Sequence, residues 1–252
     1  MSQAKVVLIT GVAGGIGYAT AQRFDQAGWR VIGLDYKAND QVDPHSIHHY
    51  ISVDLSDAAA IAHCITTLKS EITTLNALVN NAALQICKPA VDMAVAEWDQ
   101  VMAVNVRAPF ILSQQLYPLL KLGQGSVVNV SSVHAIATSA NIAAYASSKG
   151  ALSALTRALA IEFAPDVRVN ALLPGAVNTP MLQDGLKRGH LSGESIDDLM
   201  DDLGRKTIMD RVGKPGEIAE SIYFLASNEC SGFMTGQSLV VDGGAIARLS
   251  TE

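Results

Sequence analysis

The sequence predicts an α/β fold built on a doubly wound, seven-stranded parallel sheet in a single domain, residues 1–252. Short apolar, β-branched runs alternate along the chain with longer segments that have helical spacing. This alternation favours right-handed crossovers and a parallel sheet covered on both faces. No linker, repeat or break in composition divides the 252 residues, a length that fits one domain.

Seven runs are candidate strands, and most are apolar throughout, as expected for strands buried on both faces. They are Lys5–Thr10, Arg30–Asp35, Tyr50–Val53, Ala77–Asn80, Ser126–Ser131, Val167–Leu172 and Ser238–Val241. Five candidate helices alternate with them, at Ile16–Ala27, Asp57–Glu71, Glu97–Leu120, Tyr145–Phe163 and Pro215–Ala226.

Three features depart from this regular pattern. Residues 36–49 are few and polar, which leaves little room for a crossover helix. Pro109 and Pro118 are expected to kink or end parts of the helix Glu97–Leu120. Residues 181–210 are charged and contain four glycines. We interpret them as a small helical flap over the substrate, with a rigid surface excursion as the alternative.

The composition excludes several classes of protein. There are 18 Lys and Arg against 24 Asp and Glu, a net charge of −6, which argues against nucleic acid or an anionic membrane as partner. No apolar run reaches the roughly 18 residues of a membrane span, and Met1 to Lys5 lack a signal-peptide pattern. Cys64, Cys87 and Cys230 form no CxxC pair, so we expect reduced thiols and a cytoplasmic location.

A glycine-rich turn joins the first candidate strand to the first helix, as Thr10-Gly11-Val12-Ala13-Gly14-Gly15-Ile16-Gly17. Glycine lets the backbone approach a ligand closely, and the free N–H groups and positive end of a helix dipole suit a pyrophosphate. The spacing is not GxGxxG, and a tight structural connection is the alternative. We predict that Gly11, Gly14, Gly15, Ile16 and Gly17 bind a dinucleotide.

Asp35 ends the second candidate strand, 20 residues after Gly15. A carboxylate at this place can accept hydrogen bonds from both hydroxyls of an adenosine ribose. It would repel a 2′-phosphate, and no Arg or Lys occupies Val12–Gly15 to offset that repulsion. The position therefore predicts NAD rather than NADP, with a solvated turn aspartate as the alternative.

Tyr145 and Lys149 are four residues apart and would share one face of a helix. A nearby ammonium is expected to lower the pKa of the tyrosine, which would make Tyr145 a general base or, in reverse, an acid. Ser132 lies just past the carboxyl end of a strand, where ligands bind in open parallel sheets. Its hydroxyl could hold the reacting oxygen beside the tyrosine.

Together these motifs resemble the short-chain dehydrogenase/reductase family over nearly the whole chain, which implies a Rossmann-like fold. The glycine turn is similar to the family's TGxxxGIG, and Asn80-Asn81-Ala82-Ala83 is similar to NNAG. Ala83 replaces the usual glycine, and we expect it to press on the adenosine ribose or to require a negative φ. Asn80 and Asn81 have two interpretations, bracing of the sheet or cofactor binding, and we assign Asn81 to the cofactor.

The resemblance also implies roles for other residues. Asn105 is implied to hold a water beside Lys149, which completes a catalytic set of Asn105, Ser132, Tyr145 and Lys149. Further cofactor contacts are implied at Asp54, Leu55, Asn81, Ala82, Ala83, Tyr145, Lys149, Pro174, Gly175, Val177 and Thr179. A homotetramer is implied, with the helices Glu97–Leu120 and Tyr145–Phe163 in one interface and Pro215–Gly244 in another.

The function implied is NAD-dependent interconversion of a secondary alcohol and a ketone, on a small polyhydroxylated or cyclic substrate. Polar contacts could come from Gln85, His134, Asn141 and Asn178, and an apolar groove from Leu84, Ile86, Met181 and Leu182. One alternative is an NADP-dependent ketone or 3-oxoacyl reductase, and another is a non-catalytic NAD-binding regulatory protein. No metal site is expected, although His45, His48 and His49 lie close together in sequence.

Overall fold

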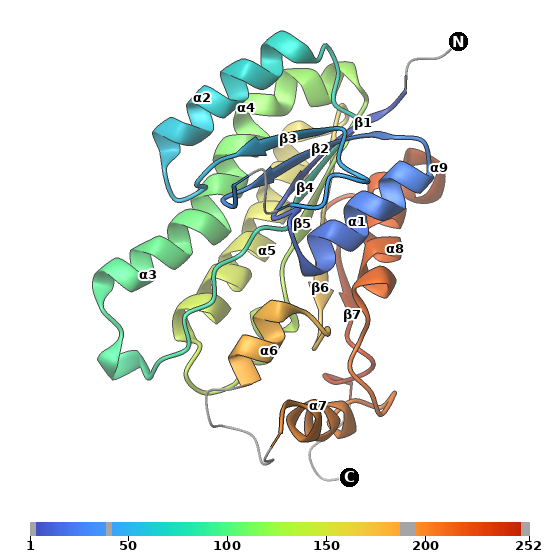
Figure 1. Cartoon of the computed structure of the whole chain (residues 1–252). Helices are drawn as coiled ribbons and strands as arrows, with labels where there is room; N and C mark the ends of the chain where they lie inside the picture. Colours follow the sequence, from blue (N-terminus) through green and yellow to red (C-terminus); the bar gives the residue numbers. More distant parts are fainter. Residues whose placement is uncertain (1–3, 39–41, 187–194, 248–252) are drawn as a thin grey trace.

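The computed structural model describes residues 4–38, 42–186 and 195–247. These residues form a parallel sheet of seven strands in the order β3-β2-β1-β4-β5-β6-β7 (Figure 1), which confirms the predicted fold. The strands are β1 Val6–Thr10, β2 Arg30–Asp35, β3 His49–Ser52, β4 Ala77–Asn80, β5 Ser126–Val130, β6 Arg168–Pro174 and β7 Ser238–Val241.

Helices cover both faces of this sheet (Figure 1). Helices α1 and α8 pack together over one face, and α2, α4 and α5 cover the other. The helices are α1 Gly15–Gln26, α2 Ala58–Glu71, α3 Val95–Met102, α4 Ala108–Leu122, α5 Ala143–Phe163, α6 Pro180–Leu186, α7 Ile196–Arg205, α8 Pro215–Ala226 and α9 Asn228–Ser231. None of the described helices is both long and apolar enough to cross a membrane.

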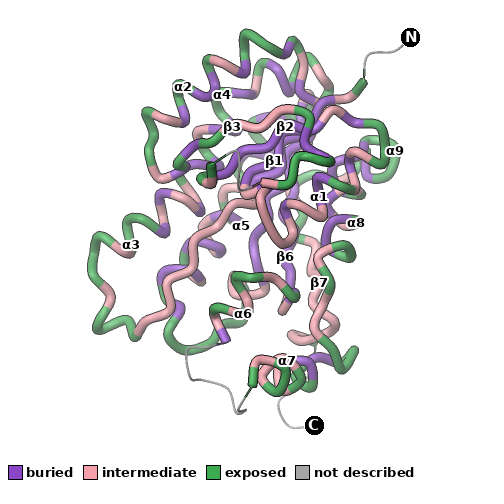
Figure 2. Tube along the Cα trace, in the orientation of Figure 1, coloured by how far each residue is buried: buried purple, intermediate pink, exposed green. Residues whose placement is uncertain are grey.

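The sheet separates two hydrophobic clusters. Every residue of β1 is buried, and its alternate side chains serve opposite faces, as the pleat of a strand requires. Leu8 packs in the cluster with α2, α4 and α5, whereas Val7 and Ile9 pack against α1 and α8. Figure 2 shows this buried centre with exposed residues around it. The continuous apolar runs in the sequence follow from burial on both faces.

The helix expected at Glu97–Leu120 departs from the prediction, because it begins at Val95 and is interrupted by a π-helical segment at Ala103–Arg107. Pro109 lies in the first turn of α4. Since proline has no N–H, it cannot donate to the carbonyl of Asn105, four residues earlier. Pro118 lies inside α4, which continues past it to Leu122. Of the two prolines, only Pro109 lies where the helix changes from π-helical to α-helical hydrogen bonding.

Two other expectations concern the connections. The described residues between β2 and β3 contain no helix, as the short polar link predicted. The segment 181–210 holds most of α6 and all of α7, while residues 187–194 lie outside the described residues. In the sheet, β1 lies between β2 and β4. The chain adds β2 and β3 on one side of β1 and then crosses to add β4 on the other side. This reversal opens a crevice at the carboxyl ends of the strands.

Candidate active site

A cavity of about 1080 Å³ lies at the carboxyl ends of the strands, with α6 and α7 along one side. It collects most of the residues predicted from sequence. Those that line it are Gly11, Gly14, Gly15, Ile16, Asp35, Asp54, Leu55, Asn81, Ala82, Ala83, Ser132, Tyr145, Lys149, Pro174, Gly175, Val177 and Thr179. Two predicted residues, Gly17 and Asn105, are not part of its lining.

The glycine turn follows β1 directly and requires its glycines for different reasons. Gly11 and Gly15 have positive φ, +67° and +52°, which other residues rarely adopt. A Cβ on Gly14 would meet nothing within 4 Å, which leaves room over the turn for a ligand. A Cβ on Gly17 would lie 2.0 Å from the carbonyl oxygen of Gly11. Gly17 therefore allows helix α1 to pack against the turn and does not contact the cavity.

The carboxylate of Asp35 is held beside the glycine turn. It is 7% exposed at the end of β2. Its carboxylate accepts hydrogen bonds from the Ala13 N–H at 3.0 Å and the Lys37 N–H at 3.3 Å. These bonds orient the side chain beside the glycine turn, where a charged group fits a ribose diol.

The two asparagines after β4 have distinct places. Asn80 is buried and donates to Asn129 Oδ1 at 2.8 Å, so it joins β4 to β5. Asn81 lines the cavity, yet its amide also donates to the carbonyls of Thr10 at 2.9 Å and Gly11 at 3.2 Å. It therefore braces the glycine turn from inside the crevice. Ala83 is not among the described residues with a positive φ, so the extra methyl group is compatible with the backbone.

Tyr145 and Lys149 lie on α5 as the four-residue spacing predicts, and both are buried. The expected effect on the tyrosine is wrong in direction. Burial raises the pKa of Tyr145 to about 12, against an opposing hydrogen bond with Ser132. Burial also lowers the pKa of Lys149 to about 7. Removal from water disfavours both charged forms, and the Lys149 ammonium donates to the Val130 carbonyl at 2.7 Å.

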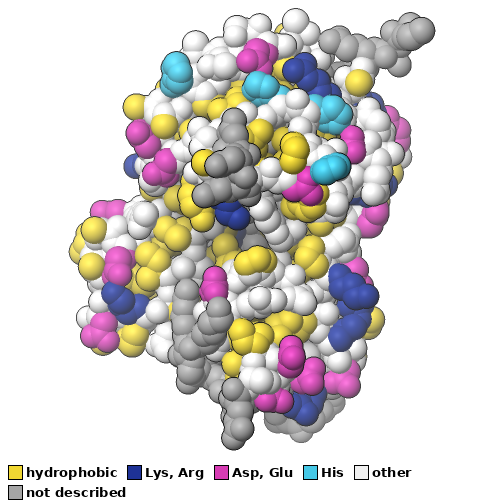
Figure 3. Space-filling model, in the orientation of Figure 1, with side chains coloured by type: hydrophobic (Ala, Val, Ile, Leu, Met, Phe, Trp, Pro, Cys, Tyr) yellow, Lys and Arg dark blue, Asp and Glu magenta, His cyan; other side chains and the backbone are white. Residues whose placement is uncertain are grey.

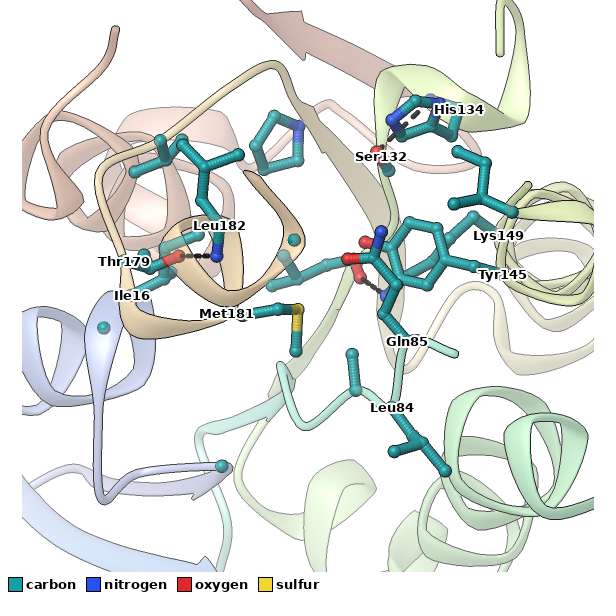
Figure 4. Close-up of a pocket in the computed structure, with 18 of the residues that line it drawn as sticks. Ile16, Leu84, Gln85, Ser132, His134, Tyr145, Lys149, Thr179, Met181 and Leu182 are labelled. Carbon is teal, nitrogen blue, oxygen red and sulfur yellow. Dashed lines mark hydrogen bonds between the residues drawn. The ribbon is translucent and has the colours of Figure 1, made fainter. Parts of the chain in front are cut away.

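Ser132 follows β5 and caps the short 3₁₀ turn at Val133–Ala135. Its Oγ accepts a hydrogen bond from the backbone N–H of His134 at 3.2 Å. The His134 ring meets the Tyr145 ring edge-on with 6.0 Å between centroids. Burial lowers the pKa of His134 and so favours the neutral imidazole. Figure 4 shows Ser132 and His134 together on one side of the site.

Asn105 is fully buried in the π-helical segment. Its Oδ1 accepts from the Leu84 N–H at 2.8 Å, and its Nδ2 donates to the Leu84 carbonyl at 2.9 Å and to Ser148 Oγ at 2.9 Å. Ser148 in turn donates to the carbonyl of Tyr145 at 2.7 Å. The Asn105 side chain thus fixes the loop after β4 to α5, a positioning role that the sequence did not indicate.

The substrate end of the cavity combines polar and apolar side chains. Of the residues considered from sequence, Gln85, His134, Asn141, Leu84, Met181 and Leu182 line it, whereas Ile86 and Asn178 do not. Sequence reasoning missed Cys87, Leu186, Leu203 and Ala245, which also line it. The sequence signal for Leu186 and Leu203 was weak, because residues 181–210 contain no motif. Opposite the tyrosine, Met181 and Leu182 lie beside Thr179 (Figure 4).

The three neighbouring histidines do not converge. His45 pairs with Asp43 at 2.5 Å, His48 faces Asp25 at 3.5 Å and His49 faces Glu71 at 3.3 Å. The histidines on this side of the molecule are spread over its upper part (Figure 3). Across the described ranges, no group of three or more His, Cys, Asp or Glu side chains is arranged to hold a metal ion.

Comparison with known proteins shows which family has this arrangement. The family described as enoyl-(acyl carrier protein) reductase matches residues 11–245. Cyclopentanol dehydrogenase from Comamonas sp. (strain NCIMB 9872) is 34% identical over 254 residues, which cover 96% of this chain and 97% of that protein.

Two solved structures are similar throughout. The ligand-free aldohexose dehydrogenase of Thermoplasma acidophilum superimposes with a TM-score of 0.91 at 33% identity, over 98% of this chain and 96% of the other. A 4-hydroxyisoleucine dehydrogenase complexed with NADH gives a TM-score of 0.86 at 30% identity, over 97% and 100%. With its glycine turn and the Ser132, Tyr145 and Lys149 cavity, this chain belongs to the short-chain dehydrogenase/reductase family of oxidoreductases.

Proposed function

We propose that this protein is an NAD-dependent dehydrogenase that interconverts a secondary alcohol and a ketone, on a small polyhydroxylated or cyclic substrate. The observation that carries the proposal is the single cavity that joins Asp35 and the glycine turn to Ser132, Tyr145 and Lys149. The relatives support it, since their names include a cyclopentanol and an aldohexose dehydrogenase and one is bound to NADH.

Each of the four predicted catalytic residues has a separate role in the proposed reaction. When bound, the nicotinamide cofactor supplies the acceptor for a hydride from the carbinol carbon. Tyr145 takes the hydroxyl proton at its phenolic oxygen, and Ser132 hydrogen-bonds the same substrate oxygen. Because the pKa of Tyr145 is about 12, its phenolate needs stabilisation inside the site, and the hydrogen bond from Ser132 lowers that pKa. Lys149 holds the nicotinamide ribose, and Asn105 supports a water-linked path for the proton.

The remaining cofactor contacts follow the lining of the cavity. The glycine turn holds the pyrophosphate, Asp35 the adenosine ribose, and Asp54 and Leu55 the adenine. Residues on the loops after β4 and β6 complete the site, at Asn81, Ala82, Ala83, Pro174, Gly175, Val177 and Thr179. Residues 181–210 act as a substrate flap within one domain of residues 1–252, because α6 and α7 both contribute to the cavity wall.

We further propose a cytoplasmic homotetramer. Large apolar side chains are exposed on α4 and α5, at Phe110 and Ile161, and on or after α8, at Phe224 and Phe233. Exposed apolar surface of this kind is typical of interfaces between subunits. The three cysteines are free, which fits a reducing compartment.

An NADP-dependent ketone or 3-oxoacyl reductase is the second candidate, and the apolar side chains of Leu84, Met181 and Leu182 in the cavity favour it. Asp35 argues against NADP, because a buried carboxylate would face the 2′-phosphate. A non-catalytic NAD-binding regulator is disfavoured, since it would not need Ser132, Tyr145 and Lys149 in one cavity.

Titration with each cofactor tests the proposal. We expect NAD to bind at least ~100-fold more tightly than NADP, and Asp35→Ser to reduce that ratio at least ~10-fold. Asp54→Asn is the matched control, because it removes a second carboxylate from the same cavity and should change both affinities alike. Equal or tighter binding of NADP to the wild-type protein would refute NAD dependence.

A further inference from the structure

Gln85 is a polar side chain at the substrate end of the cavity. It follows Leu84 on the loop after β4 and lines the cavity together with Tyr145, Ser132 and His134. Figure 4 shows its side chain extending from the loop toward Tyr145. Within the described part of the chain, its amide donates to Cys87 Sγ at 3.2 Å, and a thiol is a weak acceptor. The amide therefore retains capacity to bind a ligand.

The loop that carries Gln85 is fixed at both ends. Before it, both backbone polar groups of Leu84 are bonded to the Asn105 amide. After it, the Lys88 N–H donates to the Asn141 carbonyl at 2.7 Å, and Lys88 Nζ donates to both carboxylate oxygens of Glu97 at 2.7 and 2.8 Å. Groups held this firmly on both sides lose little entropy when they bind a substrate. Gln85 is thus presented to the cavity in a defined place.

Three of the described lysines that line the cavity already have a partner for the ammonium group, and that of Lys149 is the Val130 carbonyl. Lys88 is paired with Glu97, and Lys206, which also lines the cavity, is paired with Asp202 at 3.1 Å. Burial lowers the pKa of His134 and so favours its uncharged ring. Of the described side chains that line the cavity near Tyr145 (Figure 4), the Gln85 amide and the His134 imidazole match a hydroxyl or carbonyl oxygen.

Across the site from Gln85 (Figure 4), helix α6 contributes apolar side chains to the cavity, those of Met181, Leu182 and Leu186. A carbon ring would bury against these side chains, whereas an open polyol would leave its hydroxyls without partners there, at a cost for each. The arrangement fits a ring with an apolar flank and oxygens gathered on one edge.

We propose that Gln85 is a specificity-determining residue that binds a second, uncharged oxygen next to the reacting carbinol, so that the enzyme prefers cyclic vicinal diols to the corresponding simple alcohols. This inference rests on the proposed function and deepens it. Gln85 takes no part in proton or hydride transfer, and its effect is confined to substrates that carry the second oxygen.

The test compares Gln85→Met, which keeps the length of the side chain and removes its amide, with wild type. The substrates are cyclohexanol and the cis and trans isomers of cyclohexane-1,2-diol, with NAD+ in excess. In the variant, kcat/KM for the preferred diol should fall roughly 3- to 10-fold, the net worth of one hydrogen bond, while kcat/KM for cyclohexanol changes less than about 2-fold. Gln26→Met, at the exposed end of α1, is the matched control and should alter neither.

The ratio of the two kcat/KM values is measured within each variant, so differences in the amount of folded enzyme cancel. An unchanged ratio in Gln85→Met, or equal losses on diol and cyclohexanol, would overturn the role of Gln85 and leave the proposed function standing. A wild-type protein that reduces NAD+ with none of these alcohols would overturn the preference for cyclic diols. If it also reduces NAD+ with no other secondary alcohol, the proposed function is overturned as well.

Discussion

Lys149 is a buried cation, and its replacement by methionine should make the fold more stable while abolishing activity. The side chain is 1% exposed, and burial lowers its pKa from 10.5 to about 7. At about 1.4 kcal/mol per pKa unit, this drop corresponds to about 5 kcal/mol of unfavourable burial. Methionine removes that cost but leaves the Val130 carbonyl without its 2.7 Å partner, a loss of about 1–3 kcal/mol. The expected gain in free energy of unfolding is on the order of 2–4 kcal/mol.

The sign of the pH dependence follows from the lowered pKa of Lys149. Below pH 7 the lysine is protonated in both the folded and the unfolded chain, so the full cost of burial is present. Between pH 7 and 10.5 the unfolded chain keeps a proton that the folded chain has released, so the stability of the wild-type protein rises with pH. The advantage of the variant must shrink over the same range. Tyr145, with a pKa of about 12, titrates above it.

Thermal unfolding at pH 6 and pH 9.5, without cofactor, measures the effect. For a chain of this size, each kcal/mol shifts Tm by roughly 2–4 °C, so Lys149→Met should raise Tm by roughly 5–15 °C at pH 6 and by much less at pH 9.5. Lys69→Met is the matched control, because Lys69 is exposed in the last turn of α2 and its loss should shift Tm by about 2 °C or less. No increase at pH 6, or an equal increase at both pH values, would refute the reasoning.

Four further outcomes are expected. Tyr145→Phe keeps the ring and removes the proton-transfer group, so kcat should fall at least ~100-fold with NAD still bound; a mutant with most of its activity would exclude this role. Gly17→Ala places a methyl group 2.0 Å from the Gly11 carbonyl oxygen and should lower Tm by roughly 5 °C or more, whereas Gly14→Ala, with open space around its Cβ, should unfold like wild type. Asn105→Ala leaves buried polar groups unpaired, at about 1–3 kcal/mol, and should reduce both Tm and kcat; a normal kcat would contradict its positioning role. Solution mass at micromolar concentration should be that of a tetramer, and a monomer would rule out the proposed assembly.

The sequence by itself determined the sheet, the glycine turn with Asp35, and the pairing of Tyr145 with Lys149 on one helix. All seven candidate strands form. The five inner strands are almost wholly buried, and a parallel strand buried on both faces must be apolar along its length, which is a local pattern. The edge strands β3 and β7 are only partly buried. The glycine turn follows from a local requirement, because its backbone needs a positive φ at Gly11 and Gly15. The place of Asp35 is also local, because this residue ends a strand. The spacing of Tyr145 and Lys149 predicts a shared face through the geometry of one helix.

Only the tertiary structure decided the pKa values of the catalytic residues and which side chains line the substrate end of the cavity. The sequence predicts that Lys149 lowers the pKa of Tyr145, but burial raises it and lowers that of the lysine, because desolvation depends on neighbours from the whole fold. The anchoring of Leu84 by Asn105 joins residues 21 positions apart, and no local motif encodes that contact. Leu186 on α6 and Leu203 on α7 also line the cavity, far in sequence from Gln85 and Tyr145. Such contacts depend on how distant elements pack, which a local sequence pattern does not specify.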